Sequence, residues 1–488
     1  MTRDRTLSNF VDGSWLPPAG LTLLPVLNPS TGETIVQVPL SDGAVVNAAV
    51  RGADVAFKAW SRTPAVERIQ FLFKFKFLLE QHLEDLAQTI IDDCGKTRQE
   101  ALGELRRGIE NVEVACGIPS LLQGYNNEDI AAGIDEHLFR QPLGVIAAVT
   151  PFNFPALIPL WFLPYAIACG NCIVLKPSEQ TPMACGRLFE LLAETGLPKG
   201  VAQLVHGGKE TAEALIDHPL VKAVSFVGST ENARAVYRRA TASGKRAQCN
   251  GAAKNPVIIL PDADMEMATK SIADGAFGGA GQRCLGVSLA ITVGDAQRPF
   301  VEAISAAASE RRVGYGGDEG VQMGPVISRN SQARIEQLIA TGVGEGAVAR
   351  VEGRGLKVSG YENGSFHFPT VLENVAPLGT IACTEIFGPV LGIIAVRTLE
   401  EAIELVNKAR YGNTACLFTS SGAAAARTFR QEAAAGNVGI NVAVAQPNAF
   451  FSFGGFKESF FGDLHPQGRH AVEFYTQTKV VIERWLYK

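Results

Sequence analysis

The chain has 488 residues, a formal net charge of −5, 47% hydrophobic residues and 19% charged residues. A chain of this length is too long for one ordinary core, so we expect two or three substructures. The composition is that of a globular protein rather than a disordered or fibrous one. The small negative charge and the lack of a long lysine or arginine run argue against nucleic acid as a partner.

Helical patterns dominate the chain between residues 41 and 116, where apolar residues recur at spacings of three and four. From Val145 onward, short apolar segments alternate with helical ones, which predicts a parallel sheet with right-handed crossovers. We predict helices at 42–60, 65–95 and 98–117, and strands at 144–150, 172–178, 201–207, 222–229 and 246–251.

No charged side chain lies between Arg140 and Lys176, which raises the alternative of a membrane helix. Five prolines interrupt this run, and proline breaks helices. The better interpretation is a buried strand, a buried helix over 155–170 and a second buried strand, because fully buried parallel strands are continuous apolar runs. We therefore expect no membrane partner. The N-terminal residues also lack the apolar segment of a secretory signal.

A second strand–helix series begins near Val257 and predicts a second α/β lobe. The expected strands are 256–261, 289–294, 370–375, 392–397, 416–420 and 437–441, and the expected helices are 271–281, 298–312 and 399–409.

The last segment, 471–488, alternates apolar and polar residues and predicts an exposed strand. An exposed strand edge promotes association unless another strand pairs with it. Residues 136–142 are a candidate partner, either within the chain or across a subunit boundary.

The stretch "GAGQRCLG" (279–286) places Cys284 among glycines and directly after Arg283. One interpretation is a buried small apolar residue, which is the commonest role of a free cysteine. The other is a nucleophile, because a neighbouring cation favours thiolate and glycines allow a substrate to approach the backbone closely. The residues alone leave both interpretations open.

A second pair of cysteines, in "CGNC" (169–172), has the spacing of redox and zinc sites. It has no second pair and lies within the apolar run, so a structural role is favoured, and the scattered histidines suggest no metal site. The total of nine cysteines is odd, which argues against a disulfide framework and favours a reducing, cytoplasmic location.

Two further stretches are candidates for nucleotide contacts. In "FVGSTENA" (226–233) a strand leads through Gly-Ser-Thr into a helix, and a helix N-terminus binds phosphate, although the full glycine fingerprint is missing. Lys176 and Glu179 follow another strand, at the end where open α/β sheets bind ligands. They suit two ribose hydroxyls, and the alternative is a solvated surface loop.

Five motifs, in order along the chain, together resemble the aldehyde dehydrogenase superfamily. The resemblance covers nearly the whole chain and implies an α/β fold with a Rossmann-type cofactor lobe, an α/β catalytic lobe and a small β flap that forms a homo-oligomer, either a dimer or a tetramer. It implies an NAD-binding domain at 1–120 and 141–252, a catalytic domain at 253–455 and an oligomerisation segment at 121–140 and 466–488. The motifs are "TPFNFP" (150–155), "LKPSE" (175–179), "FVGST" (226–230), "GQRC" (281–284) and "EIFGPV" (385–390).

This resemblance also assigns roles to residues. Cys284 would attack an aldehyde, hydride would pass to the nicotinamide, and a thioester would remain on the sulfur. Asn153 and the backbone N–H of Cys284 would form the oxyanion hole. Glu179 would favour NAD over NADP, because a carboxylate repels a 2′-phosphate. The residues expected to contact NAD are Thr150, Phe152, Lys176, Glu179, Gln180, Ser229, Gly251, Glu385 and Phe387.

One position departs from the general family pattern. Most hydrolytic members carry a glutamate in the motif E-L-G-G-K, whereas this chain reads "NGAAKN" (250–255), with Asn250 at the place of the glutamate. Asparagine has no basic site with which to activate water. A thiol needs far less activation, so coenzyme A is the expected co-substrate that accepts the acyl group.

Longer stretches, including 151–171, 244–255 and 474–479, resemble the CoA-acylating methylmalonate-semialdehyde dehydrogenases of this superfamily. The resemblance implies a small semialdehyde substrate, methylmalonate or malonate semialdehyde, whose carboxylate is held by Arg107 and Arg283. The alternative for Arg107 is a helix-surface arginine. Residues 443–468 follow the pattern only in part, which leaves the substrate open. A hydrolytic dehydrogenase and a catalytically silent relative are the rival interpretations.

Overall fold

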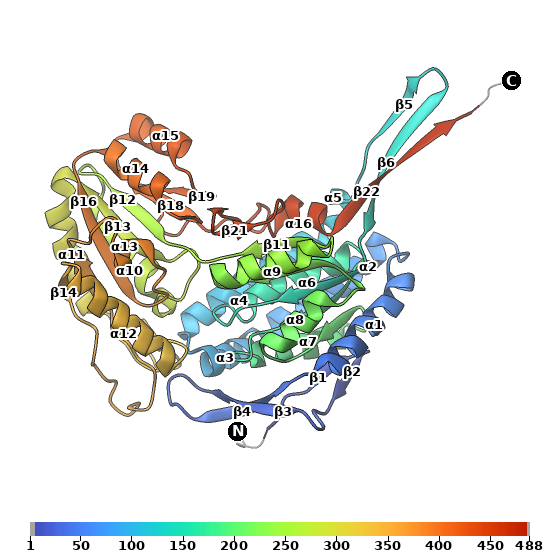
Figure 1. The fold of residues 1–488 in the computed structure, drawn as a ribbon, viewed down its shortest axis with the longest axis horizontal. Helices are drawn as coiled ribbons and strands as arrows, with labels where there is room; N and C mark the ends of the chain where they lie inside the picture. The colour runs from blue at the N-terminus through green and yellow to red at the C-terminus, as the bar shows by residue number, and fades with distance from the viewer. Residues whose placement is uncertain (1–4, 486–488) are drawn as a thin grey trace.

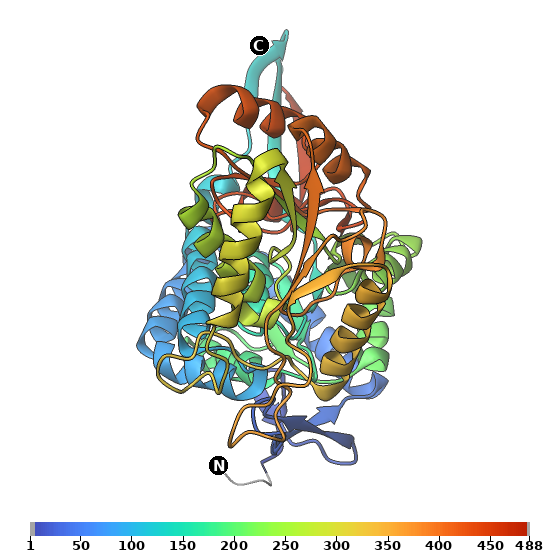
Figure 2. The same ribbon diagram turned by 90° about the vertical axis from the view of Figure 1, so that its left-hand side faces the viewer.

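The computed structural model describes residues 5–485, which form two α/β lobes and a narrow three-stranded arm (Figure 1). Seen from the side of the second lobe, its helices and strands lie in front of the first lobe (Figure 2). The outermost residues of the predicted cofactor domain, 1–4, and of the predicted final strand, 486–488, lie outside the described residues.

The first lobe is built on an eight-stranded sheet with the order β2-β1-β9-β8-β7-β10-β11-β21. The five strands from β9 to β11 are parallel, as the strand–helix alternation predicts, and β1 and β21 pair antiparallel at the two sides. The strands are β1 (Asn9–Val11), β2 (Ser14–Leu16), β7 (Val145–Val149), β8 (Cys172–Lys176), β9 (Ala202–Leu204), β10 (Val221–Val227), β11 (Arg246–Asn250) and β21 (Phe460–Phe461).

The helices of the first lobe follow the predicted pattern with one correction. The single helix predicted over 65–95 is two helices, because the backbone of His82 leaves the helical region at φ −103° and ψ 22°. The helices are α1 (Gly43–Trp60), α2 (Ala65–Gln81), α3 (Leu83–Cys94), α4 (Arg98–Cys116), α5 (Ile118–Leu121), α6 (Leu157–Ala168), α7 (Met183–Glu194), α8 (Lys209–Asp217) and α9 (Thr230–Ala242).

The uncharged run forms β7, α6 and β8, as predicted. Every residue of α6 is buried, because this helix packs against β7 and β8 on one side and against α2 and α4 on the other. A helix enclosed in this way is apolar all round. Within residues 5–485, no helix has the length and apolar character needed to cross a membrane.

The second lobe has its own core around a seven-stranded sheet with the order β14-β15-β16-β13-β12-β18-β19. All its strands are parallel except β14 at one edge. The strands are β12 (Asn255–Ile259), β13 (Val287–Val293), β14 (Val348–Val351), β15 (Thr370–Glu373), β16 (Val390–Val396), β18 (Thr414–Phe418) and β19 (Asn437–Ile440).

Three helices of this lobe match the predicted segments, and three others lie where no helix was predicted. The matching helices are α10 (Met265–Phe277), α11 (Gln297–Ser309) and α14 (Leu399–Lys408). The predicted helix is wrong for residues 278–281, which follow α10, because Gly279 and Ala280 have left-handed φ values. The others are α12 (Arg329–Gly344), α13 (Thr380–Cys383) and α15 (Gly422–Glu432).

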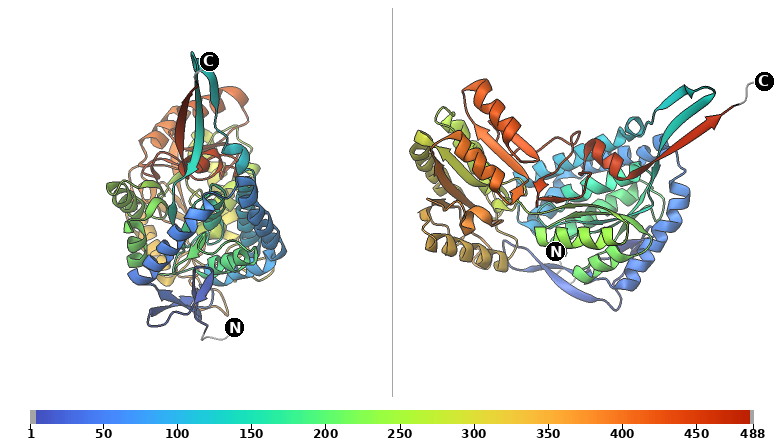
Figure 3. Two further views of the ribbon diagram at one scale, coloured as in Figure 1. Left: turned by 90° about the vertical axis from the view of Figure 1, so that its right-hand side faces the viewer. Right: turned by 45° about the horizontal axis from the view of Figure 1, so that its top comes forward.

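The arm is an antiparallel sheet of β5 (Asn126–Ala131), β6 (Ile134–Pro142) and β22 (Thr476–Arg484), which projects away from both lobes (Figure 3). The predicted pairing of the final strand with residues 136–142 is confirmed within the chain. The predicted strand is wrong for residues 471–474, which belong to helix α16 (Gly468–Phe474).

The last part of the chain connects the two lobes. In the second lobe β20 (Phe456–Lys457) pairs with β17 (Tyr411–Gly412), whereas β21 joins the first sheet beside β11. The polypeptide therefore passes between the lobes more than once.

Near the N-terminus, the hairpin of β3 (Thr22–Leu27) and β4 (Thr34–Leu40) forms a separate two-stranded sheet.

Candidate active site

Cys284 follows α10 on a loop with an unusual backbone. Gly279, Ala280 and Gly281 have φ values of 59°, 52° and 71°, in the left-handed region. A Cβ atom on Gly281 would lie 2.0 Å from the carbonyl oxygen of Gly388, so only glycine allows these two loops to touch. The glycine-rich stretch thus brings the cysteine loop against the loop that follows Glu385.

Side-chain amides hold the cysteine in place. The Nδ2 atoms of Asn255 and Asn413 each donate to the carbonyl oxygen of Cys284 at 2.8 Å. Gln282 accepts the backbone N–H of Ile327 at 2.9 Å through its Oε1 atom. The half-buried Cys284 lines a large cavity beside this loop.

Burial raises the pKa of the Cys284 thiol to about 12, and the charge of Glu385 acts in the same direction. Arg283 lowers this pKa, as the sequence predicted, but its effect is smaller than that of burial. The thiol is therefore protonated at neutral pH, and nucleophilic attack requires a proton acceptor or an additional positive charge beside it.

The first cavity has a volume of about 1180 Å³ and lies at the carboxyl ends of β7, β8 and β10, where open α/β sheets bind ligands. The structure brings most of the predicted cofactor residues to it. Gln180 is exposed and does not line it. The predicted residues that do line it are Thr150, Phe152, Asn153, Lys176, Glu179, Ser229, Gly251, Cys284, Glu385 and Phe387.

Lys176 is buried rather than solvated. Its Nζ atom donates to the carbonyl oxygens of Pro177 at 2.7 Å and Gly207 at 2.5 Å, and lies 3.3 Å from a carboxylate oxygen of Glu179. Burial lowers the pKa of Lys176, although the Glu179 charge opposes this shift. The solvated-loop alternative is therefore wrong for Lys176, whereas the Glu179 side chain remains about one-third exposed.

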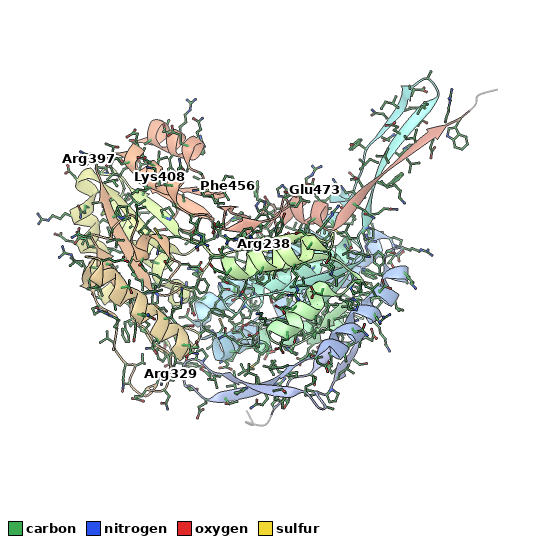
Figure 4. The ribbon with its side chains drawn as sticks, viewed as in Figure 1. Arg238, Arg329, Arg397, Lys408, Phe456 and Glu473 are labelled. Atoms are coloured by element: carbon green, nitrogen blue, oxygen red, sulfur yellow. The ribbon has the colours of Figure 1, made fainter. Side chains whose placement is uncertain are left out.

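The N-terminus of α9 faces the same cavity. Ser229 is its N-cap and accepts the backbone N–H of Asn232 at 3.4 Å. Two arginines of this helix also line the cavity, Arg239 and Arg238, and Figure 4 labels Arg238. Arg239 belongs to the last turn of α9 and is ion-paired with Asp217, so it is the helix N-terminus itself that is suited to a phosphate group.

The Glu385 loop forms another wall. Glu385 accepts the backbone N–H of Ala253 at 2.7 Å, and burial raises the pKa of this carboxyl to about 7. Arg334 clamps the loop by donating to the carbonyl oxygens of Ile386 at 2.7 Å and Glu385 at 2.8 Å. Phe387 has a left-handed φ of 54° and meets the Phe152 ring edge-on at 5.8 Å between centroids.

Sequence reasoning missed Arg334. It lies on α12, a helix that was not predicted, and its contacts are with backbone atoms more than fifty residues away. No local pattern in the sequence marks such a contact.

The two candidate asparagines differ in their placement. Asn153 lines the first cavity and donates through Nδ2 to the carbonyl oxygen of Gln282 at 2.9 Å, which ties it to the Cys284 loop. Asn250 lies at the end of β11, is buried and does not line the first cavity. Among residues 5–485, its amide nitrogen has no hydrogen-bond partner.

A second cavity, of about 500 Å³, contains both predicted carboxylate-binding arginines. Arg107 donates to the side chain of Asn448 at 2.8 Å and forms an ion pair with Glu110 at 2.7 Å. Arg283 donates to the carbonyl oxygen of Asp274 at 3.3 Å, and no acidic side chain of the described residues forms an ion pair with it. Four basic and three acidic side chains line this cavity, and the resulting excess of positive charge favours an anionic ligand.

The surroundings of these arginines bear on two predictions. Arg106 is exposed, as expected for a helix-surface arginine, whereas Arg107 lines the cavity. The divergent segment 443–468 borders the same cavity through Gln446, and Pro447 accepts a hydrogen bond from Arg107 at 2.5 Å. Phe450 and Phe451, further along, are exposed.

The cysteines of "CGNC" lie in the core of the first lobe. Burial raises the pKa of both Cys169 and Cys172. All nine cysteines belong to the described part of the chain, and none forms a disulfide. Within the described residues, no group of three His, Cys, Asp or Glu side chains has the arrangement of a metal site.

Comparison with known proteins places the chain in a family. A malonate-semialdehyde dehydrogenase of Geobacillus thermodenitrificans is 46% identical over 99% of this chain and 100% of its own length. A methylmalonate-semialdehyde dehydrogenase of Oceanimonas doudoroffii is 44% identical, with a TM-score of 0.97 over 99% of both chains. A Sinorhizobium meliloti protein solved in complex with NAD is 40% identical, with a TM-score of 0.97 over 100% of this chain and 99% of that one. Residues 15–481 match the aldehyde dehydrogenase family, and the chain belongs to that family.

Proposed function

We propose that the protein is an NAD-dependent, CoA-acylating dehydrogenase of malonate or methylmalonate semialdehyde. The observation that carries this proposal is the position of Cys284 and its neighbour Arg283. The cysteine lines a cavity suited to a dinucleotide, and the arginine lines a second cavity suited to a carboxylate. The names of the two semialdehyde dehydrogenases among the relatives support the same substrate class.

The first cavity fits NAD. The N-terminus of α9 suits the pyrophosphate, and Lys176 and Glu179 suit the adenosine ribose. The hydroxyl oxygen of Thr150 is buried there without a partner among residues 5–485, and a ligand would satisfy it. Glu385 and Phe387 suit the nicotinamide ribose. When bound, NAD accepts the hydride from the oxidised carbon.

The Cys284 thiol gives up its proton to water in the cavity, its sulfur forms the covalent bond to the aldehyde carbon, and Asn153 acts on the oxygen that becomes negative. The Asn153 amide and the Cys284 backbone N–H donate hydrogen bonds to that oxyanion. Loss of hydride from the carbon then leaves a thioester on the sulfur. The distal carboxylate of the semialdehyde binds Arg107 and Arg283 in the second cavity.

CoA accepts the acyl group, because the position of the water-activating base holds Asn250. With methylmalonate semialdehyde, the product after loss of carbon dioxide is propionyl-CoA. Neither the amide nor the buried position of Asn250 supplies a proton acceptor for water.

The cellular setting and assembly belong to the same proposal. The absence of disulfides among nine cysteines supports a reducing, cytoplasmic location. The arm exposes Phe139, Val480 and Ile482, which supports a homo-oligomer, either a dimer or a tetramer, formed through 121–140 and 466–488. The NAD-binding domain is assigned to 1–120 and 141–252, and the catalytic domain to 253–455.

The test is NADH formation across a panel of semialdehydes and propanal, each with and without CoA. We expect steady turnover only with CoA, formation of an acyl-CoA, and preference for malonate or methylmalonate semialdehyde. Rapid release of a free acid without CoA would instead establish a hydrolytic dehydrogenase. Absence of NADH with every aldehyde would indicate a catalytically silent relative.

A further inference from the structure

One face of helix α4 lies against the second cavity. Glu100, Glu104 and Arg107 are spaced by four and three residues, so they lie on the same side of the helix, and all three line the cavity. Arg107 belongs to the proposed carboxylate site. The two glutamates have no assigned role, and each of them is hydrogen-bonded to a loop of the active site.

Glu104 holds the loop that follows Asn153. Its Oε1 atom accepts the backbone N–H groups of Ala156 at 2.8 Å and Leu157 at 3.0 Å. These groups belong to the first turn of α6, whose N-cap residue Ala156 has no capping side chain of its own. The carboxylate of Glu104 supplies that cap from another helix, and its negative charge suits a helix N-terminus.

A buried cation fixes Glu104 in turn. Lys96 Nζ lies 2.5 Å from Glu104 Oε2, and the two side chains are only 7% and 0% exposed. The same ammonium group lies 3.7 Å from the centre of the Phe154 ring, directly after Asn153. Residues 153–157 are therefore held at Phe154 by Lys96 and at the start of α6 by Glu104.

We propose that Glu104, through its ion pair with Lys96, is a positioning residue that sets Asn153 against Cys284. This inference rests on the proposed function. Asn153 stabilises an oxyanion only if its amide lies within hydrogen-bonding distance of the correct point, and small displacements of such groups cost large factors in rate. The ion pair fixes the loop from behind, without touching the aldehyde.

The test is the rate of the first NADH burst with propanal, which has no carboxylate and so does not report on Arg107. Two variants are compared, Glu104→Gln and the double variant Lys96→Met/Glu104→Leu. The double variant removes both charges together, because a single truncation would leave a buried charge unpaired and destabilise the fold. Glu113→Gln, on the exposed part of the same helix, is the matched control.

We expect the burst of the double variant to slow by about 10- to 100-fold. Glu104→Gln keeps an oxygen for the two N–H groups but leaves the buried Lys96 ammonium without its ion-pair partner, so its burst should slow as well. The affinity for NAD and the rate of Cys284 alkylation should stay within about twofold of the unmodified protein, since neither Lys96 nor Glu104 lines the first cavity. Glu113→Gln should behave as the unmodified protein does.

An unchanged burst in the double variant would overturn the inference. A parallel fall in alkylation and burst would also overturn it, because that result indicates general loosening of the site. If the double variant does not fold, Lys96→Met/Glu104→Gln, which removes both charges but keeps an oxygen for the two N–H groups, decides by the same criteria. Failure of the proposed function is separate, because it would appear as the absence of a burst in the unmodified protein.

Discussion

The two cavities beside the cysteine loop are built in different ways. The first is formed by the ends of parallel strands, the start of a helix and loops whose shape depends on glycine and on a left-handed Phe387. The second is lined by charged side chains from α4 and the cysteine loop, including Arg107 and Arg283. Cys284 lines the first cavity and its neighbour Arg283 lines the second, so a single peptide bond joins the walls of the two cavities. In the proposed function, cofactor binding therefore depends mainly on backbone geometry, and aldehyde selection on individual side chains.

The largest expected effect is a complete loss of catalysis in a variant that still binds NAD in the first cavity. Cys284→Ala should abolish NADH formation with every aldehyde, because the sulfur that forms the covalent bond is gone. NAD binding, measured by calorimetry, should persist, since the walls of the cavity are unchanged. Substantial turnover by this variant would remove Cys284 from the mechanism.

The next effect concerns the fate of the thioester. Without CoA the unmodified protein should give one equivalent of NADH per active subunit and then slow. Asn250→Glu should raise the rate of free-acid release, because a general base typically contributes about 10²–10⁴-fold. Product analysis with and without CoA measures this change.

The burial of Asn250 limits that gain. The new carboxylate must reach the first cavity past Gly251, where a Cβ atom would lie 2.9 Å from neighbouring oxygens. A rise in acid release smaller than tenfold would show that the buried position of residue 250, and not only its lack of a basic group, suppresses hydrolysis.

The second cavity should control selectivity. Arg107→Ala and Arg283→Ala should each lower kcat/KM for malonate semialdehyde by about 10- to 100-fold relative to propanal, because a charge-assisted hydrogen bond is lost only with the carboxylate. NAD affinity should not change. Arg106→Ala is the matched control, since Arg106 is exposed on the same helix. Equal losses for both aldehydes would reject the carboxylate site.

The smallest expected effect is a shift in the pKa of the Cys284 thiol, which the charge of Glu385 influences. Ionised Glu385 raises the pKa of Cys284, so Glu385→Gln should lower that pKa. Because the pKa of Glu385 is about 7, the two proteins should differ above pH 7 and converge below it. Alkylation rates of Cys284 against pH measure the shift, which should not exceed about one pKa unit, or tenfold in thiolate. A shift in the opposite direction would contradict this electrostatic account.

The sequence predicts the residues that line the first cavity better than it predicts the residues that hold the active-site loops in place. Local motifs mark Asn153, Lys176, Ser229 and Glu385, because each lies where a strand or loop has a recognisable pattern. Gln180, which follows Glu179 in the chain, is exposed and does not line this cavity, although the resemblance predicts a contact with NAD.

Residues that act through distant backbone atoms leave no such pattern. Glu104 contacts residues 156 and 157, and Asn413 contacts a carbonyl 129 positions earlier. The helix break at His82 was missed for a related reason, because the apolar spacing continues through it while the backbone does not.

The pairing of β22 with β6 has a consequence for biosynthesis. About 330 residues separate Pro142, at the end of β6, from Thr476, where β22 begins. At 5–20 residues per second, the ribosome needs roughly 15–70 s to make that interval. During this time the edge of β6 that later pairs with the nine-residue β22 has no partner on the nascent chain, and such edges pair with neighbouring copies. The yield of native protein should therefore depend on how quickly the final segment is translated, independently of the stability of the finished fold.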